Sequence, residues 1–233
     1  MITLSTDFKD IYRPSLSLMH ILCIKAAFEG SALEEDMWVQ IEDGKAIGAV
    51  AKNGGRLYLF SPHGDTDELT EFINTVGFSE IFTEKATAKR LGLKTEKEYE
   101  VLLRKSVKSA EFDPLGIGLS PLYDGLKFGE DGDISLPSFK DFAADISHRL
   151  RHGAAVAALN ENSAALGFKC EKGLIINGIS VKRELRGRNL GRLILGELLS
   201  YSDGDVLAAA EAKNTEFYIK NGFEVIDKAV IAR

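Results

Sequence analysis

The stretch VKRELRGRNLGR, residues 181–192, decides the fold of the second half of the chain. It follows an apolar run at Gly173–Val181 and precedes an amphipathic run at Leu190–Tyr201, so it predicts a glycine-bearing loop between a buried strand and a helix. Backbone N–H groups of such a loop can converge on one point, where the helix N-terminus adds about half a positive charge. The stretch therefore predicts a binding site for a diphosphate.

The side chains of this loop favour the same interpretation. Arg186, Arg188 and Arg192 add positive charge, while Gly187 and Gly191 remove the Cβ atoms that would keep phosphate oxygens away from the backbone. The alternative is a helix start with a solvated basic face and no ligand.

The periodicity around this loop predicts an α/β chain with a mixed sheet. The expected elements of the second half are a helix at 138–152, strands at 154–159, 164–170 and 173–181, a helix at 190–201, a strand at 206–210, a helix at 214–221 and a strand at 223–232. The first of these helices ends at Gly153, and Asn214 is the expected N-cap of the last. The buried face of the 190–201 helix is expected to hold Leu193, Ile194, Leu195, Leu198 and Leu199.

The first half repeats this order more faintly. It predicts strands at 38–41, 46–51 and 57–60, a helix at 69–76, a strand at 78–82, a charged helix ending near Leu91-Gly92 and a strand at 98–104. The repetition indicates a duplicated unit, with one domain at 1–106 and a second at 107–233. Glu111–Pro137 is rich in Gly, Pro and Asp and predicts a linker or irregular region. Where the diphosphate loop should recur, residues 61–68 (SPHGDTDE) are acidic and would repel a diphosphate.

Two motifs of the second half resemble those of the GNAT acetyltransferases. Arg186, Asn189 and Gly191 occupy the three defined places of the family's Arg/Gln-x-x-Gly-x-Gly/Ala pyrophosphate loop, and EFYIKNGF at 216–223 is similar to its closing Phe-Tyr-x-Lys-x-Gly-Phe segment. The likeness covers about Phe139–Arg233. One departure is Asn189, which stands where the family usually has glycine. Asn tolerates a left-handed backbone better than other non-glycine residues, although its side chain could crowd a phosphate.

The resemblance implies the GNAT acyl-CoA N-acyltransferase fold in two tandem units, the first degenerate and without a cofactor loop. It also implies that acetyl-CoA is the acyl donor. In the family the central strand and its neighbour splay apart and pantetheine pairs with the strand backbone. Asn177-Gly178 fits a bulge at that opening, although Gly178 fits a packing contact with a helix equally well. The expected cofactor-binding residues are Ile179, Val181, Arg186, Gly187, Arg188, Asn189, Leu190, Gly191, Arg192, Asn214, Phe217 and Tyr218.

By the same resemblance, Tyr218 is the general acid that protonates the departing CoA thiolate, and the N–H near Ile179 is an oxyanion donor. A core tyrosine beside Phe217 is the alternative for Tyr218. The strand at 173–181 carries no carboxylate, so Glu211 is the candidate base, against the alternative of a solvated loop glutamate.

A second cluster of titratable residues lies on the 138–152 helix. His148 shares a helix face with Asp141, Asp145 and His152, which either lines a substrate pocket or faces water. We interpret it as a solvated face.

The sequence thus predicts an N-acetyltransferase in which a primary amine attacks acetyl-CoA directly. The alternative from another class is a non-catalytic CoA-binding sensor or scaffold, which Asn189 and the missing strand carboxylate keep open. A nucleic-acid binder using Lys182, Arg183 and the loop arginines is disfavoured by the net charge of -6 and by the lack of interleaved aromatic residues.

Composition bounds the remaining partners. No apolar run approaches the ~20 residues that span a bilayer, and the N-terminus does not have the pattern of a signal peptide, so a cytoplasmic protein is expected. Cys23 and Cys170 have no metal-ligand spacing, and no metal site is expected. The acceptor is a small-molecule or peptide amine, and a homodimer is compatible with the sequence. Acidic residues that would suit a cationic amine are Asp113, Asp124, Glu130, Asp131 and Asp133.

Overall fold

The structure is a computed structural model that describes residues 1–4, 36–53, 55–129, 136–170 and 173–233. In the described part the chain forms two compact units. The first contains the described residues up to Leu102 together with Ala209–Arg233, and the second contains Leu103–Ala208. The chain passes into the second unit within strand β6 (Thr95–Ser106) and returns to the first within strand β10 (Gly204–Ala210).

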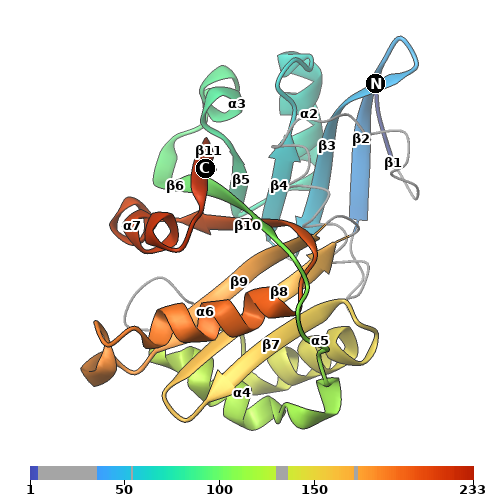
Figure 1. Cartoon of the computed structure of the whole chain (residues 1–233). Coiled ribbons are helices and arrows are strands. Elements are labelled where there is room, and N and C mark those ends of the chain that lie inside the picture. The colour runs from blue at the N-terminus through green and yellow to red at the C-terminus, as the bar shows by residue number, and fades with distance from the viewer. Residues whose placement is uncertain (5–35, 54, 130–135, 171–172) are drawn as a thin grey trace. The chain divides into compact units, whose positions relative to one another are not determined.

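The second unit contains the central strand of the sequence analysis. Its strands β10, β9, β8 and β7 lie in that order, with β9 (Gly173–Val181) parallel to β10 and antiparallel to β8 (Ser163–Cys170), which is antiparallel to β7 (Ala155–Asn160). Its helices are η2 (Pro114–Gly116), α4 (Leu119–Leu126), η3 (Lys127–Gly129), α5 (Phe139–Arg151), η4 (Arg183–Leu185) and α6 (Leu190–Ser200). Figure 1 shows α6 on one side of the strands and α4 with α5 on the other.

Small and apolar residues let helices cover both faces of these strands. In β7 the run from Ala155 to Ala158 is completely buried, as expected for a strand that is covered on both faces. Alternate residues of β7 and β8 pack against α4 and α5 in one apolar core. On α6 the buried residues are Ile194, Leu195, Leu198 and Leu199. Apolar side chains of α4, α5 and α6 thus cover these strands.

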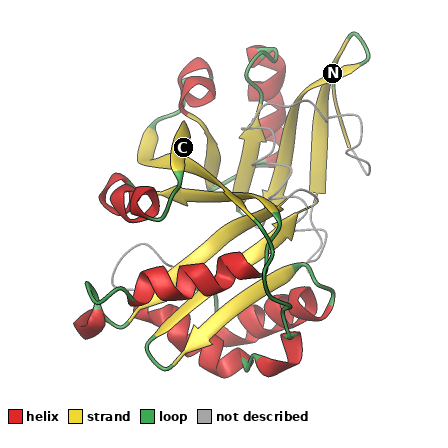
Figure 2. Cartoon of the chain, in the orientation of Figure 1, coloured by secondary structure: helices red, strands yellow, loops and turns green. Residues whose placement is uncertain are grey.

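The first unit repeats the same arrangement, with strands in yellow and helices in red in Figure 2. Its strand order is β1, β2, β3, β4, β5, β11 and β6. The bounds are β1 Ile2–Leu4, β2 Asp36–Glu42, β3 Lys45–Asn53, β4 Arg56–Phe60, α2 Thr66–Val76, β5 Glu80–Glu84 and α3 Lys85–Arg90. As in the second unit, three antiparallel strands precede a helix and a strand that is parallel to the third, here β4 and β5. The prediction of a duplicated α/β unit with a mixed sheet is confirmed.

The end of the chain lies in the first unit. After α7 (Ala212–Lys220), strand β11 (Glu224–Ala232) pairs antiparallel with β5, with Val230 opposite Thr83. Val230 and Ala232 are buried against Ala88 of α3. The predicted division into 1–106 and 107–233 therefore describes two repeats in sequence, whereas the compact units differ from it because the last strand of the second repeat pairs within the first unit.

Two predictions of local structure in the second unit are wrong. Glu111–Pro137 was expected to be irregular, but it contains α4, whose Leu122, Tyr123 and Leu126 are buried in the core. Pro121 lies in the first turn of α4, where a missing N–H breaks no helical hydrogen bond. Leu193 was expected on the buried face of α6, but it is 64% exposed because it lies on the helix face opposite the buried Ile194, Leu195, Leu198 and Leu199.

Candidate functional site

The loop between β9 and α6 has the backbone conformation that an anion site needs. Gly187 has a φ of 80°, and Asn189 is the N-cap of α6 with a φ of 62° in the left-handed region. Asn189 thus adopts the conformation for which glycine is favoured, as its place in the motif predicts. The first N–H groups of α6 have no partner within the helix and point out of its N-terminus, where the loop precedes it. This geometry favours a phosphate at Gly187–Gly191.

The three arginines of the loop differ in their surroundings. The Arg186 guanidinium donates from Nε to the Val181 carbonyl at 3.1 Å and from Nη2 to the Phe128 carbonyl at 2.6 Å. Arg188 and Arg192 are exposed, and within the described residues no hydrogen bond or ion pair holds their side chains. Two of the three predicted cations are therefore available to an anion, while the third binds backbone carbonyls.

A bulge interrupts β9 where the sequence predicts it. Leu166 of β8 lies opposite Gly178, and the next residue, Gly167, lies opposite Ile176, so Asn177 is the extra residue on β9. The bulge interpretation of Asn177-Gly178 is confirmed, and the Asn177 side chain is exposed. A bulge bends its strand and increases the local twist. The direction of β9 therefore changes between its two halves.

The pairing of β9 with β10 stops just before this bulge. Gly173–Ile175 pair with Asp205–Leu207, and no later residue of β9 pairs with β10 in this fully described region. The Lys182 N–H donates to the Asn162 carbonyl at 2.9 Å, on the β8 side of the strand. Because backbone groups alternate along a strand, the N–H groups of Val181 and Ile179 face the other side, which β10 leaves open. This unpaired edge can accept an extended ligand.

The remaining predicted residues lie on or next to α7. Asn214 was expected to cap this helix, but α7 begins at Ala212 with Glu211 as its N-cap, and no side-chain hydrogen bond caps it. Asn214 lies in the first turn, where its N–H donates to the Glu211 carbonyl at 2.8 Å. The prediction was wrong because Ala212 and Lys213, both good helix formers, extend the helix by two residues.

The Glu211 carboxylate, the candidate base, has two cationic neighbours. Lys97 Nζ lies 3.5 Å from one oxygen, and Lys213 Nζ lies 3.3 Å from the other. The side chain is 23% exposed. These contacts favour a structural carboxylate at the start of α7.

Tyr218, the predicted acid, packs among aromatic rings. Its ring meets those of Phe217 and Phe223 edge to face, with centroids 5.2 Å and 5.3 Å apart. Burial of the phenol raises the pKa of Tyr218 well above its usual value, so the hydroxyl is protonated at neutral pH. A protonated phenol agrees with a general acid and with a core tyrosine alike.

The predicted site residues therefore fall into two groups. Ile179–Arg192 lie together in the second unit, and Glu211–Tyr218 lie in the first. Sequence reasoning missed the role of Phe128, whose carbonyl binds Arg186. It also missed Ser180, whose hydroxyl donates to the Gly125 carbonyl at 2.7 Å. Ser180 carried a signal, because it is a polar residue within a largely apolar strand.

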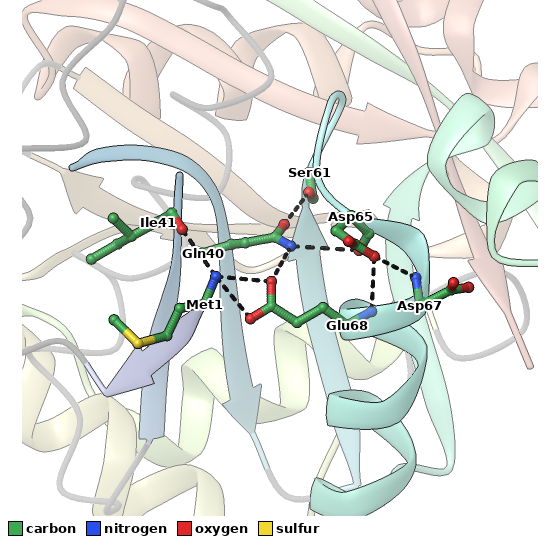
Figure 3. A network of polar contacts seen from close by, with 7 residues as sticks. All are labelled: Met1, Gln40, Ile41, Ser61, Asp65, Asp67 and Glu68. Atoms are coloured by element: carbon green, nitrogen blue, oxygen red, sulfur yellow. Dashed lines mark hydrogen bonds and ion pairs between the residues drawn. The ribbon is translucent and has the colours of Figure 1, made fainter. Parts of the chain in front are cut away.

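The corresponding junction of the first unit, between β4 and α2, is filled by its own side chains (Figure 3). Asp65 Oδ1 accepts from the N–H groups of Asp67 at 2.8 Å and Glu68 at 3.0 Å, so a carboxylate already caps the helix. Gln40 is 1% exposed and links this helix to Ser61: its amide donates to Glu68 at 2.9 Å and accepts from Ser61 Oγ at 2.8 Å. The Asp65 carboxylate thus already binds helix N–H groups that would otherwise be free to bind an anion.

Close packing around Gly64 also indicates that this junction is filled by the protein itself. A Cβ added to Gly64 would lie 1.9 Å from Gln40 Oε1. Arg90 donates to the Gly64 carbonyl at 3.2 Å and also to the Ser61 carbonyl. The Met1 amino group and Gln40 hold the pKa of Glu68 below its usual value. The acidic loop of the first half is thus a self-contained polar network.

The titratable residues around His148 on α5 contact one another and neighbouring protein groups. Asp145 accepts from Arg149 Nε at 2.8 Å, and Arg149, which is 1% exposed, also lies over the Phe168 ring at 4.6 Å. The rings of His148 and His152 are 4.3 Å apart. In the described residues no group of three or more His, Cys, Asp and Glu side chains is arranged to hold a metal ion.

Of the acidic residues predicted to favour a cationic amine, two are described. Asp113 caps η2 by accepting from the Leu115 N–H at 2.9 Å, and Asp124 lies 3.9 Å from Lys127 Nζ. Glu130, Asp131 and Asp133 lie outside the described residues, as does Cys23. No helix in the described ranges is both long and apolar enough to cross a membrane.

No protein-family model matches the chain, and no curated protein matches it significantly. Solved structures do match along nearly the whole length. A GCN5-related N-acetyltransferase from Kribbella flavida superposes with a TM-score of 0.62 at 10% identity, covering 94% of this chain and 96% of that one. A GCN5-related N-acetyltransferase from Sphaerobacter thermophilus gives 0.58 at 13% identity, covering 96% and 87%.

A third match concerns the duplication. A tandem GNAT protein from the clavulanic acid biosynthesis pathway superposes with a TM-score of 0.56 at 14% identity, covering 100% of this chain and 97% of that one. The coverage extends over both repeats, so the fold that these proteins share is the tandem arrangement seen here.

Proposed function

We propose that this chain, which has the tandem GNAT fold, is an N-acetyltransferase that transfers the acetyl group of acetyl-CoA to a primary amine. One observation carries the proposal. In the second unit, a loop with left-handed residues at the N-terminus of α6 directly follows a strand whose edge β10 leaves unpaired. A diphosphate and an extended pantetheine require these two features in this order.

The residues of the second unit divide the binding of acetyl-CoA between them. The N–H groups of Gly187–Gly191 and the dipole of α6 would hold the diphosphate, with Arg188 and Arg192 adding charge. The open edge of β9 at Ile179 and Val181 would donate to the pantetheine amides. An N–H at this edge, that of Ile179, would also stabilise the negative charge that develops on the thioester oxygen.

Acetyl-CoA supplies a thioester, an activated acyl group whose leaving group is a thiolate. The acceptor nitrogen forms a bond to the acyl carbon, the C–S bond breaks, and the electron pair of that bond leaves on sulfur. We propose that Tyr218 gives its phenolic proton to the sulfur and that the resulting phenolate regains a proton from solvent. The amine proton passes to solvent, because Lys97 and Lys213 are paired with the Glu211 carboxylate. The resemblance of the motif around Tyr218 supports this role, and the protonated phenol is compatible with it.

The first unit would bind no acetyl-CoA. Its junction already contains the Asp65 carboxylate at the helix N-terminus and the buried Gln40 amide. We therefore expect one acetyl-CoA per chain. The amine acceptor, small molecule or peptide, and a homodimer stay predictions.

Calorimetric titration with acetyl-CoA tests the proposal, with a matched pair of variants. Gly191→Glu places a carboxylate in the first turn of α6, where it would repel the diphosphate, and should abolish binding. Gly196→Glu makes the same change later in α6, where an added Cβ meets open space, and should bind like the wild type. Absence of binding by the wild type, or equal binding by both variants, would contradict the assignment.

A non-catalytic CoA-binding module is the second candidate, favoured by the two lysines at Glu211 and by the absence of a carboxylate from β9. Tyr218→Phe separates the two. Tyr201→Phe is the control, because the Tyr201 hydroxyl donates to Glu197, one helical turn earlier, at 3.2 Å. A catalyst should lose turnover in Tyr218→Phe and keep its affinity for acetyl-CoA. Binding without turnover of any amine in a broad library would favour the sensor.

A further inference from the structure

Arg186 is the first residue of the loop motif, yet its guanidinium is directed at the protein. It spans two backbone carbonyls from distant parts of the chain, Val181 at 3.1 Å and Phe128 at 2.6 Å. A guanidinium has a planar, fixed set of donors, so two bonds to two segments fix their separation and orientation. A phosphate ligand would instead direct these donors at the anion.

Both carbonyls lie at the ends of secondary-structure elements, where a donor with positive charge is stabilising. The Val181 carbonyl and the Lys182 N–H belong to one trans peptide and therefore point in opposite directions. Because the Lys182 N–H donates to Asn162 on the β8 side, the Val181 carbonyl lies on the edge of β9 that β10 leaves open. The Phe128 carbonyl lies in η3, just after α4, where the last carbonyls of a helix lack partners and carry partial negative charge. Arg186 satisfies both with one charged group.

Two further contacts join the same pair of segments. Ser180 Oγ donates to the Gly125 carbonyl at 2.7 Å, and Lys182 Nζ lies 5.3 Å from the centre of the Phe128 ring. Both Ser180 and Gly125 are buried. Ser180, Lys182 and Arg186 thus connect the C-terminal end of β9 and the residues after it to α4 and η3. Of the three, Arg186 lies next to the glycine loop.

We propose that Arg186 is a positioning residue of the cofactor loop and not a phosphate ligand. By fixing the backbone immediately before Gly187, which has a φ of 80°, it holds the N–H groups of 187–191 in the direction that an anion requires. The role rests on the proposed function, because it assumes that this loop binds the diphosphate of CoA. Preorganisation of this kind raises affinity by lowering the ordering cost of binding.

The test compares Arg186→Lys, Arg186→Gln and the control Arg188→Gln, using CoA as the probe. Calorimetry gives the dissociation constant from about 0.05 M to about 0.3 M salt, where screening of exposed charges changes strongly. Hydrogen exchange of the free proteins gives the protection of amides 187–192, with the amides of β7 and β8 as an internal check of folding.

For a positioning residue, Arg186→Lys keeps the charge but loses the planar fork, and CoA binding should weaken about tenfold with an unchanged salt dependence. Exchange at 187–192 should accelerate in both Arg186 variants without CoA. Arg188→Gln should flatten the salt dependence and leave exchange unchanged, because the Arg188 side chain is exposed.

The opposite pattern would overturn the proposal: wild-type affinity and exchange in Arg186→Lys, with a flattened salt dependence in Arg186→Gln. Failure of the proposed function is distinguishable from this outcome. If the wild type binds no CoA, the proposed function fails, and the exchange measurement on the free proteins still decides whether Arg186 fixes the loop.

Discussion

Gly187 and Gly196 provide a matched test of the loop backbone, because the same substitution should have opposite effects at the two positions. Gly187 has a φ of 80°, and Gly196 lies within α6. An added Cβ meets nothing within 4 Å at either glycine. Steric clashes with neighbours therefore cancel, and the comparison isolates the backbone.

The magnitudes follow from the two conformations. A left-handed backbone costs an L-residue about 1–2 kcal/mol, and the loss of unfolded-state entropy returns about 0.4–1 kcal/mol, so Gly187→Ala should destabilise by about 1 kcal/mol. Gly196→Ala should stabilise by about 1 kcal/mol, since alanine is the better helix former. For a chain of this size the two variants should melt about 4–8 °C apart.

Thermal unfolding followed by circular dichroism at a fixed heating rate measures the difference, and calorimetry with acetyl-CoA follows on the same samples. Gly187→Ala should also weaken binding, because alanine disfavours the left-handed turn of the loop, whereas Gly196→Ala should bind like the wild type. Equal melting temperatures, or a stabilised Gly187→Ala, would refute the inference that the loop depends on a left-handed residue at 187.

Three further predictions concern single side chains. Burial raises the pKa of Tyr218 in the folded state, so the stability that this group contributes is complete below pH ~10, the unfolded pKa, and is lost as the pH rises through the folded pKa. Tyr218→Phe should therefore lose less of its urea midpoint at alkaline pH than the wild type. An unchanged dependence of the urea midpoint on pH would count against burial of the phenol. Ser180→Ala should cost about 1 kcal/mol by urea unfolding, since the Gly125 carbonyl loses a donor in the core; a neutral result would show that the link between β9 and α4 is dispensable. Asp65→Ala should cost about 1 kcal/mol through loss of the α2 cap, with Asp65→Asn close to wild type; equal stability of all three proteins would contradict the cap.

Local signals were sufficient for most of the second unit. The apolar run at Gly173–Val181 is strand β9 as predicted, and Ser138 and His152, the ends of the predicted helix, are the caps of α5. These elements combine a strong hydrophobic period with a clear start or stop residue. The Asn177-Gly178 bulge was also readable, because a polar residue and a glycine interrupt an otherwise apolar strand.

Other features depend on contacts between segments distant in sequence. Helix α4 was missed because its Pro121 and Gly125 suggest a turn, while its stability comes from burial of Leu122 and Leu126 against the strands. The pairing of β11 with β5 could not be predicted, since nothing in the sequence of a strand specifies which repeat it joins. The carbonyl contacts of Arg186 were hidden for the same reason.

The two strand-to-helix junctions differ in the groups that lie at the helix N-terminus. Both have the same topology, so the backbone alone does not decide whether an anion binds. In the second unit the helix begins after a left-handed Asn189, with no side chain capping it and with Arg188 and Arg192 exposed beside it. In the first unit the Asp65 carboxylate supplies the negative charge from within the chain, and Gln40 occupies the adjoining space. A protein carboxylate at a helix N-terminus satisfies the same N–H groups that a diphosphate would. Asp65→Gly should therefore uncover the first helix without creating a second site, because Asp67 and Glu68 still place negative charge in the first turn of α2. Calorimetry of that variant should still give one acetyl-CoA per chain, and a stoichiometry of two would show that the capping carboxylate alone had closed the first junction.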